Sequence, residues 1–134
     1  MLDLIDTASA NLNLSVLCKA VTQVGLIVTL RGGPFTILAP DNDAFAKMPE
    51  GMLDYLMENE SELKSVLLYH IIPGRYTAGE LSKLYSINTA LDKPVEIQIS
   101  GKILAINTAH IVTKDIETAN GLIHVIDKVL FPLK

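Results

Sequence analysis

The sequence contains a single cysteine and no tryptophan, and aromatic residues make up only 5% of its 134 residues. One cysteine excludes an intramolecular disulfide, so cysteine content does not place the protein inside or outside the cytosol. Because aromatic side chains are few, the core must be mainly aliphatic, which the hydrophobic content of 49% allows. The length fits one domain, and we expect a single domain over residues 1–134.

Long apolar runs and clusters of positive charge are also missing. The apolar stretch Val24–Leu30 is far too short to span a bilayer. The net charge of −4 and the scattered basic residues argue against a nucleic-acid partner and against a polybasic membrane-binding surface. No secretory signal is visible, because Met1 leads directly into an acidic amphipathic stretch. Either the chain is cytosolic or an export segment has been removed from it.

The C-terminal stretch Asn120–Pro132 predicts a central strand around which the other elements are arranged. An Asn-Gly turn signal precedes a run with Leu122 and Ile126 on one face and Ile123 and Val125 on the other. A strand that is apolar on both faces belongs in the middle of a packed structure. The proline at the end of the stretch is expected to end the strand, because proline cannot donate to a ladder.

Apolar residues follow helical spacing in the first half of the chain and strand alternation in the second. Helices are expected over 2–10, from an Asn13 cap to Gly25, around Ala44 and Phe45 after an Asp41 or Asn42 cap, over 51–58, from a Ser61 cap through Leu67, and over 78–84 after a Thr77 cap. Strands are expected at Phe35–Ala39, at the alternating Val95, Ile97 and Ile99, after a Ser100-Gly101-Lys102 turn at Ile103–Ile106, and at His110–Thr113. This segregation of helices and strands predicts an α+β fold.

Three segments resemble the sequence boxes of the fasciclin domain, in the family's order. Asn120–Pro132 is similar to its C-terminal box, an Asn-Gly turn followed by apolar-apolar-His-Val-Ile-Asp, an apolar pair and proline. Phe35–Phe45 is similar to an upstream box, and Leu67–Gly74 contains the family's Tyr-His pair. The resemblance covers essentially the whole chain. It implies a fasciclin-like fold in which N-terminal helices pack on a wedge of mostly antiparallel β-strands.

The resemblance also implies a function that composition does not provide. It implies an extracellular or cell-surface adhesion module that binds protein or glycan partners through surface loops, without a cofactor. It therefore favours a removed export segment over a cytosolic location. A domain that binds a small apolar ligand is the alternative, because an aliphatic core can enclose a pocket. We do not expect an enzyme, since the sequence offers no assembled set of catalytic groups.

The segment Lys114-Asp115-Ile116 is the first candidate for partner binding. It precedes the Asn-Gly turn and is expected to form a loop between two strands. It matches the core of an Asp-Ile-centred pentapeptide that the resemblance associates with integrins, although Glu117 replaces an apolar residue. A loop aspartate can complete a partner's metal site with one carboxylate oxygen, or it can bond its own backbone in an ordinary turn.

Tyr69 and His70 form the second candidate, because the resemblance also links the Tyr-His segment to integrin-type adhesion. The structural alternative is that His70 is buried, with its ring nitrogens bonded to neighbouring backbone or to Asp43. The apolar residues on both sides of the pair favour this alternative. His124 lies within an apolar strand and is expected to be structural as well.

The remaining polar residues do not suggest a metal site or a catalytic centre. The three histidines lack metal-ligand spacing. Cys18 lies on an apolar helix face, where a small buried hydrophobe is favoured over a nucleophile. Asp41-Asn42-Asp43 resembles the start of a calcium loop, but Phe45 stands where an oxygen ligand is needed. Helix capping explains these residues more simply.

Overall fold

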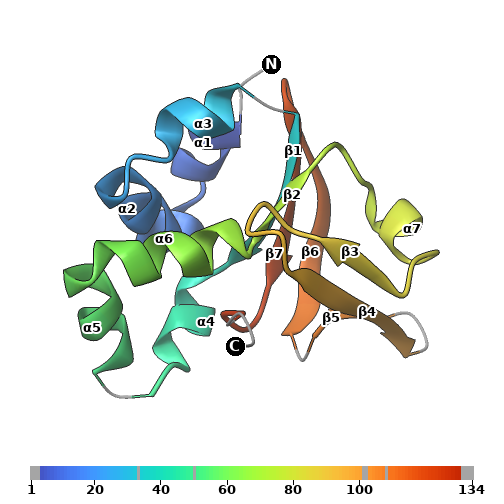
Figure 1. Ribbon diagram of the computed structural model, residues 1–134. Coiled ribbons are helices and arrows are strands. Elements are labelled where there is room, and N and C mark those ends of the chain that lie inside the picture. The colour runs from blue at the N-terminus through green and yellow to red at the C-terminus, as the bar shows by residue number, and fades with distance from the viewer. Residues whose placement is uncertain (1–3, 33, 50, 101–102, 108, 131–134) are drawn as a thin grey trace.

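The computed structural model describes residues 4–32, 34–49, 51–100, 103–107 and 109–130. Its helices are α1 (Leu4–Ser9), η1 (Leu12–Leu14), α2 (Ser15–Gln23), α3 (Ile27–Arg31), α4 (Asn42–Ala46), α5 (Met52–Glu58), α6 (Glu60–Leu68) and α7 (Ala78–Leu81). Its strands are β1 (Phe35–Pro40), β2 (Ile71–Pro73), β3 (Ser86–Asn88), β4 (Pro94–Ser100), β5 (Ile103–Ile106), β6 (Ala109–Thr118) and β7 (Gly121–Ile126). The predicted α+β class is confirmed. Helices α1 to α6 gather on one side of the strands, and α7 lies on the other (Figure 1).

The strands form one sheet in the order β2-β1-β7-β6-β5-β4-β3. Strands β1 and β7 run parallel, and the other neighbouring pairs are antiparallel, so the expected mostly antiparallel wedge is confirmed. All residues of β7 are buried, as its two apolar faces predict. The proposed stop at Pro132 and the Gly101-Lys102 part of the predicted hairpin turn lie outside the described residues.

Two apolar clusters lie on opposite sides of β1 and β7. Ile37 and Ile123 join the cluster formed with the N-terminal helices, which we call the helix-side core. Leu38 and Ile126 join the cluster formed with α7 and strands β4 and β5, which we call the hairpin-side core. This division follows from the strand geometry, because successive side chains point to opposite faces of a sheet.

The Asn120-Gly121 turn connects β6 to β7 and also anchors the N-terminal helices. The side chain of Asn120 accepts a hydrogen bond from the Leu4 N–H at 2.9 Å and donates one to the Leu30 carbonyl at 2.8 Å. A Cβ atom at Gly121 would lie 1.8 Å from the Phe35 carbonyl oxygen. Only glycine therefore lets β1 approach the start of β7 this closely.

Local capping signals predicted two helix starts correctly and two incorrectly. Asp41 caps α4 by accepting from the Ala44 N–H, and Thr77 caps α7 in a reciprocal capping box with Glu80. The prediction for Asn13 was wrong, because Asn11 holds the extended conformation of a cap and accepts from the Asn13 N–H. The prediction for Ser61 was also wrong, because α6 already begins at Glu60.

One side chain of the predicted half-buried strand β4 also departs from its expected position. Val95 and Ile97 are buried in the hairpin-side core, but Ile99, near the end of the strand, is 53% exposed.

Candidate functional site

The predicted loop at Lys114-Asp115-Ile116 lies within strand β6, so its assignment as a loop between two strands was wrong. Thr113 pairs with Val125 and Ile116 pairs with Ile123, which leaves Lys114 and Asp115 opposite the single residue His124. Two residues opposite one define a β-bulge, which keeps the strand continuous while it redirects the side chains.

Asp115 adopts the left-handed backbone conformation at the bulge, with a φ of 57°. This conformation is unfavourable for most side chains, but aspartate tolerates it better than bulky or β-branched residues do. The Asp115 N–H donates to Nδ1 of His124 at 3.0 Å, and Oδ1 of Asp115 accepts from the Ala78 N–H at 2.9 Å. The bulge is thus attached both to β7 and to the start of α7.

His124 holds the bulge through a hydrogen bond from the Asp115 N–H and is itself fully buried. Because the Asp115 N–H can only donate, Nδ1 of His124 accepts, and Nε2 carries the proton and donates to the Tyr76 carbonyl at 2.9 Å. Burial lowers the pKa of His124, although the Tyr76 carbonyl and the Asp115 carboxylate oppose this shift. The ring is therefore neutral at neutral pH, and the tautomer is set by its two backbone partners.

The outer side of the bulge is polar and exposed. Lys114 is exposed, and the side chain of Asp115 is 41% exposed even though Oδ1 is bonded. Beside them, Arg75 and Glu117 form an exposed ion pair, with 3.7 Å between Nη2 and Oε1. We call Arg75, Lys114, Asp115 and Glu117 the bulge surface. It combines two positive and two negative side chains on a backbone held by internal hydrogen bonds.

The other three candidate residues point away from this surface or lie far from it. Ile116 is half-buried and packs against the helix-side core. Tyr69 and His70 are 2% and 1% exposed, so a partner cannot reach them in the folded protein. The hydroxyl of Tyr69 donates to the Pro94 carbonyl at 2.8 Å and accepts from the Asn107 side chain at 3.1 Å. The bulge surface therefore retains two of the five sequence candidates, Lys114 and Asp115.

His70 is buried, and both ring nitrogens bond to backbone groups, as the structural alternative predicted. Asp43, the other partner considered for the ring, is not one of them. Nε2 accepts from the Leu130 N–H at 2.8 Å, so Nδ1 carries the proton and donates to the Val66 carbonyl at 2.7 Å. Desolvation lowers the pKa of His70 to about 4. The ring thus attaches the segment after β7 to the end of α6.

Sequence patterns did not rank Arg75 or Tyr76 above ordinary surface positions and placed Ala78 only in a short helix, although all three residues border the bulge. Their contacts with Asp115, Glu117 and His124 join residues 37 to 48 positions apart, so local periodicity carries no trace of them. A local signal exists only for Asp115, as a residue tolerant of left-handed backbone inside an otherwise extended segment.

Within the described ranges, no group of three histidine, cysteine, aspartate or glutamate side chains is placed to hold a metal ion. Asp41 acts as a helix cap, as expected. Cys18 is half-buried, and burial raises the pKa of its thiol above the ordinary value. The helices in the described part of the chain include none with the length and apolar content required to cross a bilayer.

Comparison with known proteins agrees with this architecture. The sequence model of the fasciclin domain matches residues 12–132, so the chain belongs to the fasciclin family. The fold is also similar to part of a solved FAS1 domain pair from the insect cell adhesion molecule fasciclin I, with a TM-score of 0.72. That match has 18% sequence identity and covers 90% of this chain and 46% of the insect chain.

Two relatives show the range of proteins in which similar sequences occur. The uncharacterized protein sll1735 of Synechocystis is 34% identical over 131 residues, which span 97% of this chain and 98% of the relative. The cell surface glycolipoprotein MPB83 of Mycobacterium bovis is also 34% identical over 131 residues, but these span 93% of this chain and 58% of the relative.

Proposed function

We propose that this protein is an extracellular or cell-surface interaction module that binds a protein or glycan partner through the bulge surface. Membership of the fasciclin family supports a role in adhesion, since similar proteins include a cell adhesion molecule and a cell surface glycolipoprotein. The role is one of binding rather than catalysis. The observation that carries the proposal is the presentation of Lys114 and Asp115 on a fixed, left-handed bulge.

Rigid presentation matters because binding costs less when the contacting groups are already ordered. The bonds from Asp115 to His124 and Ala78 hold the backbone and one carboxylate oxygen in place before a partner arrives. Oδ1 is occupied by Ala78, so Oδ2 is the oxygen left for a partner's cation, hydroxyl or amide group. A single carboxylate oxygen is sufficient to complete the coordination sphere of a divalent cation held by another protein.

The charge pattern favours a partner that also has both signs of charge or many hydroxyl groups. Lys114 and Arg75 offer donors, whereas Asp115 and Glu117 offer acceptors. Such exposed pairs are each worth little in free energy, so they are expected to govern orientation and specificity more than affinity. Modest affinity per domain would rise when several copies act together on one surface.

The sharpest test replaces Asp115 by asparagine. Asp115→Asn keeps an oxygen acceptor for the Ala78 N–H and keeps a residue type that tolerates left-handed backbone, but it removes the carboxylate charge. Asp92→Asn is the matched control, because Asp92 is also exposed and also has positive φ, 61°, at a different place. Binding of purified protein to a surface fraction of its source cells is measured before and after protease or glycosidase treatment of that fraction.

We expect saturable binding by the wild type and Asp92→Asn. Asp115→Asn should lose about tenfold in affinity, because a hydrogen bond to a charged group that the bound partner covers is worth roughly 1.5–3 kcal/mol, more than an ion pair left in water. Sensitivity to protease or glycosidase then assigns the partner to protein or glycan. Equal binding by all three folded proteins would refute the bulge surface as the contact. Absence of saturable binding by the wild type would refute the module itself.

A further inference from the structure

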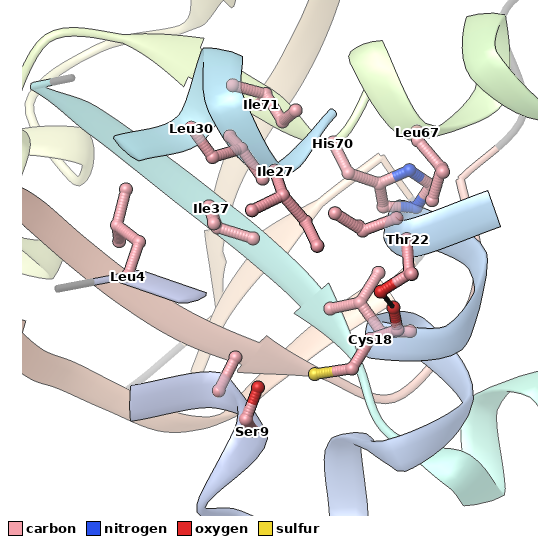
Figure 2. Close-up of a pocket in the computed structure, with 13 residues that line it drawn as sticks. Leu4, Ser9, Cys18, Thr22, Ile27, Leu30, Ile37, Leu67, His70 and Ile71 are labelled. Carbon is pink, nitrogen blue, oxygen red and sulfur yellow. Dashed lines mark hydrogen bonds between the residues drawn. The ribbon is translucent and has the colours of Figure 1, made fainter. Parts of the chain in front are cut away.

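A second candidate site lies in the helix-side core, between helices α1, α2, α3 and α6 and strands β1 and β2. The structure contains a partly enclosed cavity of about 70 Å³ there. Its inner wall is formed by buried aliphatic side chains, namely Leu4, Leu30, Ile37, Leu67 and Ile71. Figure 2 shows these side chains around an open space, with Ser9 and Cys18 at its far side. The cavity is therefore apolar at depth.

The rim of the cavity has a different character from its floor. Ser9 and Thr22 are exposed, while Cys18 and Ile27 are half-buried. The Thr22 hydroxyl donates to the Cys18 carbonyl at 2.8 Å and still has lone pairs that can accept. Neutral hydroxyl groups thus lie at the mouth, and hydrocarbon lines the interior.

The one titratable ring in the wall offers no polar group to the interior. Both nitrogens of His70 are bonded to backbone, one to Val66 and one to Leu130, so its carbon edge is what remains for a ligand. Among the described residues, no buried side-chain nitrogen or oxygen atom lacks a hydrogen-bond partner. A water molecule needs two to four polar partners in a cavity, and this interior does not supply them.

The size of the cavity selects a narrow ligand. Its volume is several times the roughly 10–15 Å³ that one water molecule requires, and about half of the ~150 Å³ in which an engineered protein cavity holds benzene. An unbranched alkyl end of a few carbons fits this space, whereas a ring the size of benzene does not. Each methylene taken from water would strengthen binding by about fourfold.

We propose that this cavity binds the methyl end of a linear aliphatic chain whose neutral polar head stays at the rim beside Ser9 and Thr22. The apolar interior would bury the aliphatic chain, and the hydroxyl groups at the rim would hydrogen-bond to the polar head. The site does not depend on the bulge surface, which lies on other elements. A failure of partner binding through Asp115 therefore leaves this inference standing.

The protein contains its own reporter of ligand binding, because Cys18 is its single cysteine and lines the cavity. We would measure the rate of Cys18 alkylation by a small maleimide with n-octanol and with α,ω-octanediol. The two probes have the same length, but the diol cannot bury its second hydroxyl without losing a hydrogen bond. At about ten times its Kd, n-octanol should slow alkylation about tenfold, and the diol should have little effect.

A variant whose side chain fills the cavity tests whether the ligand binds there. Ala8 lines the cavity and is 6% exposed, so Ala8→Leu places three further carbons in the space and should abolish protection by n-octanol. Ala119→Leu makes the same change at an exposed turn position outside the cavity and should leave protection intact. If Ala8→Leu does not fold, methyl NMR of the wild type decides, because n-octanol must then shift the resonances of Ile37 and Ile71.

A vesicle experiment distinguishes two sources of the aliphatic ligand, a membrane lipid and a free amphiphile. Phosphatidylcholine vesicles should slow Cys18 alkylation only if a membrane lipid can place an acyl end in the cavity, whereas a free amphiphile protects without vesicles. The inference is overturned if n-octanol neither slows alkylation nor shifts the two isoleucine methyl groups. It is also overturned if the diol protects as well as n-octanol, because the cavity would then not select an apolar end.

Discussion

Replacement of His70 by alanine should destabilise the protein strongly at neutral pH and weakly in acid. His70 bridges two backbone groups that are far apart in sequence, the Val66 carbonyl in α6 and the Leu130 N–H after β7. Alanine reaches neither group. The Leu130 N–H would be left without its partner inside the hairpin-side core, where Leu130 is 3% exposed.

The size of the loss at neutral pH follows from two effects. A buried donor left unsatisfied costs roughly 1–3 kcal/mol. Removal of a ring of this size from a packed interior adds a cavity cost, which brings aromatic-to-alanine changes to roughly 3–5 kcal/mol. We expect the free energy of unfolding to fall by about 4 kcal/mol, a large part of the roughly 5–15 kcal/mol of a typical domain.

The dependence on pH tests the cause of that loss. The folded-state pKa of His70 is about 4, below the ordinary value of 6.5, because burial disfavours the charged ring. Between these two values the unfolded chain binds the proton and the folded chain does not, so the stability of the wild type falls as the pH falls. The shift corresponds to something on the order of 3 kcal/mol. The alanine variant lacks this contribution, so its deficit should shrink towards about pH 4.

Urea unfolding followed by far-ultraviolet circular dichroism, at about pH 7 and about pH 4.5, measures the loss of stability at neutral pH and its decrease in acid. His110→Ala is the matched control, because the side chain of His110 is 53% exposed and its Nδ1 lies 3.5 Å from the half-buried carboxylate of Asp127. This control should cost less than about 1 kcal/mol at either pH. A deficit for His70→Ala that is as large at the acidic pH as at the neutral one would refute the assignment of a neutral, buried ring.

Two further changes test the turn at β7 and the start of α7. Gly121→Ala should cost about 3 kcal/mol or more, because the new Cβ overlaps the Phe35 carbonyl, whereas Gly32→Ala, with its nearest atom at 3.4 Å, should change stability by less than about 1 kcal/mol. Similar urea midpoints for these two variants would contradict the steric argument. Thr77→Ala should lower stability by about 1 kcal/mol through loss of the capping box, whereas Glu80→Gln, which still accepts from the Thr77 N–H, should cost less. Thermal melting compares this pair, and equal losses would count against reciprocal capping.

The elements that sequence patterns predicted correctly are those whose cause is local. Strand β7 is apolar on both faces and is indeed enclosed between β1 and β6. Thr77, predicted as a cap, does cap α7, and Glu80 completes a reciprocal capping box with it. The errors at Asn13 and Ser61 arose where another asparagine lies two residues earlier, Asn11 and Asn59, although Asn59 makes no side-chain capping bond to α6. Asn11 rather than Asn13 adopts the extended backbone that a cap requires, and position in the fold decides between them.

The bulge and the cavity could not be predicted in this way, because each depends on residues that sequence spacing does not relate. The bulge exists where Lys114 and Asp115 meet His124 from another strand, and its hydrogen bond to Ala78 spans 37 positions. The cavity is a small deficit of packing among four helices and two strands. Hydrophobic periodicity identifies the faces that meet there, but it carries no information on whether their volumes fill the space.

The two buried histidines explain how an aliphatic interior tolerates these irregular features. In each case an imidazole nitrogen accepts from a backbone N–H at a place where the chain leaves regular pairing, at Leu130 beyond β7 and at Asp115 in the bulge. The opposite nitrogen donates to a carbonyl, so one ring satisfies two backbone groups without carrying charge. The two rings use opposite tautomers, which excludes a common local motif and shows that their partners select the proton position. A protonated ring has two donors and no acceptor, so it cannot hold either N–H. Burial lowers the pKa of both rings, so each ring stays neutral, and can accept its backbone N–H, further below neutral pH than an exposed histidine would.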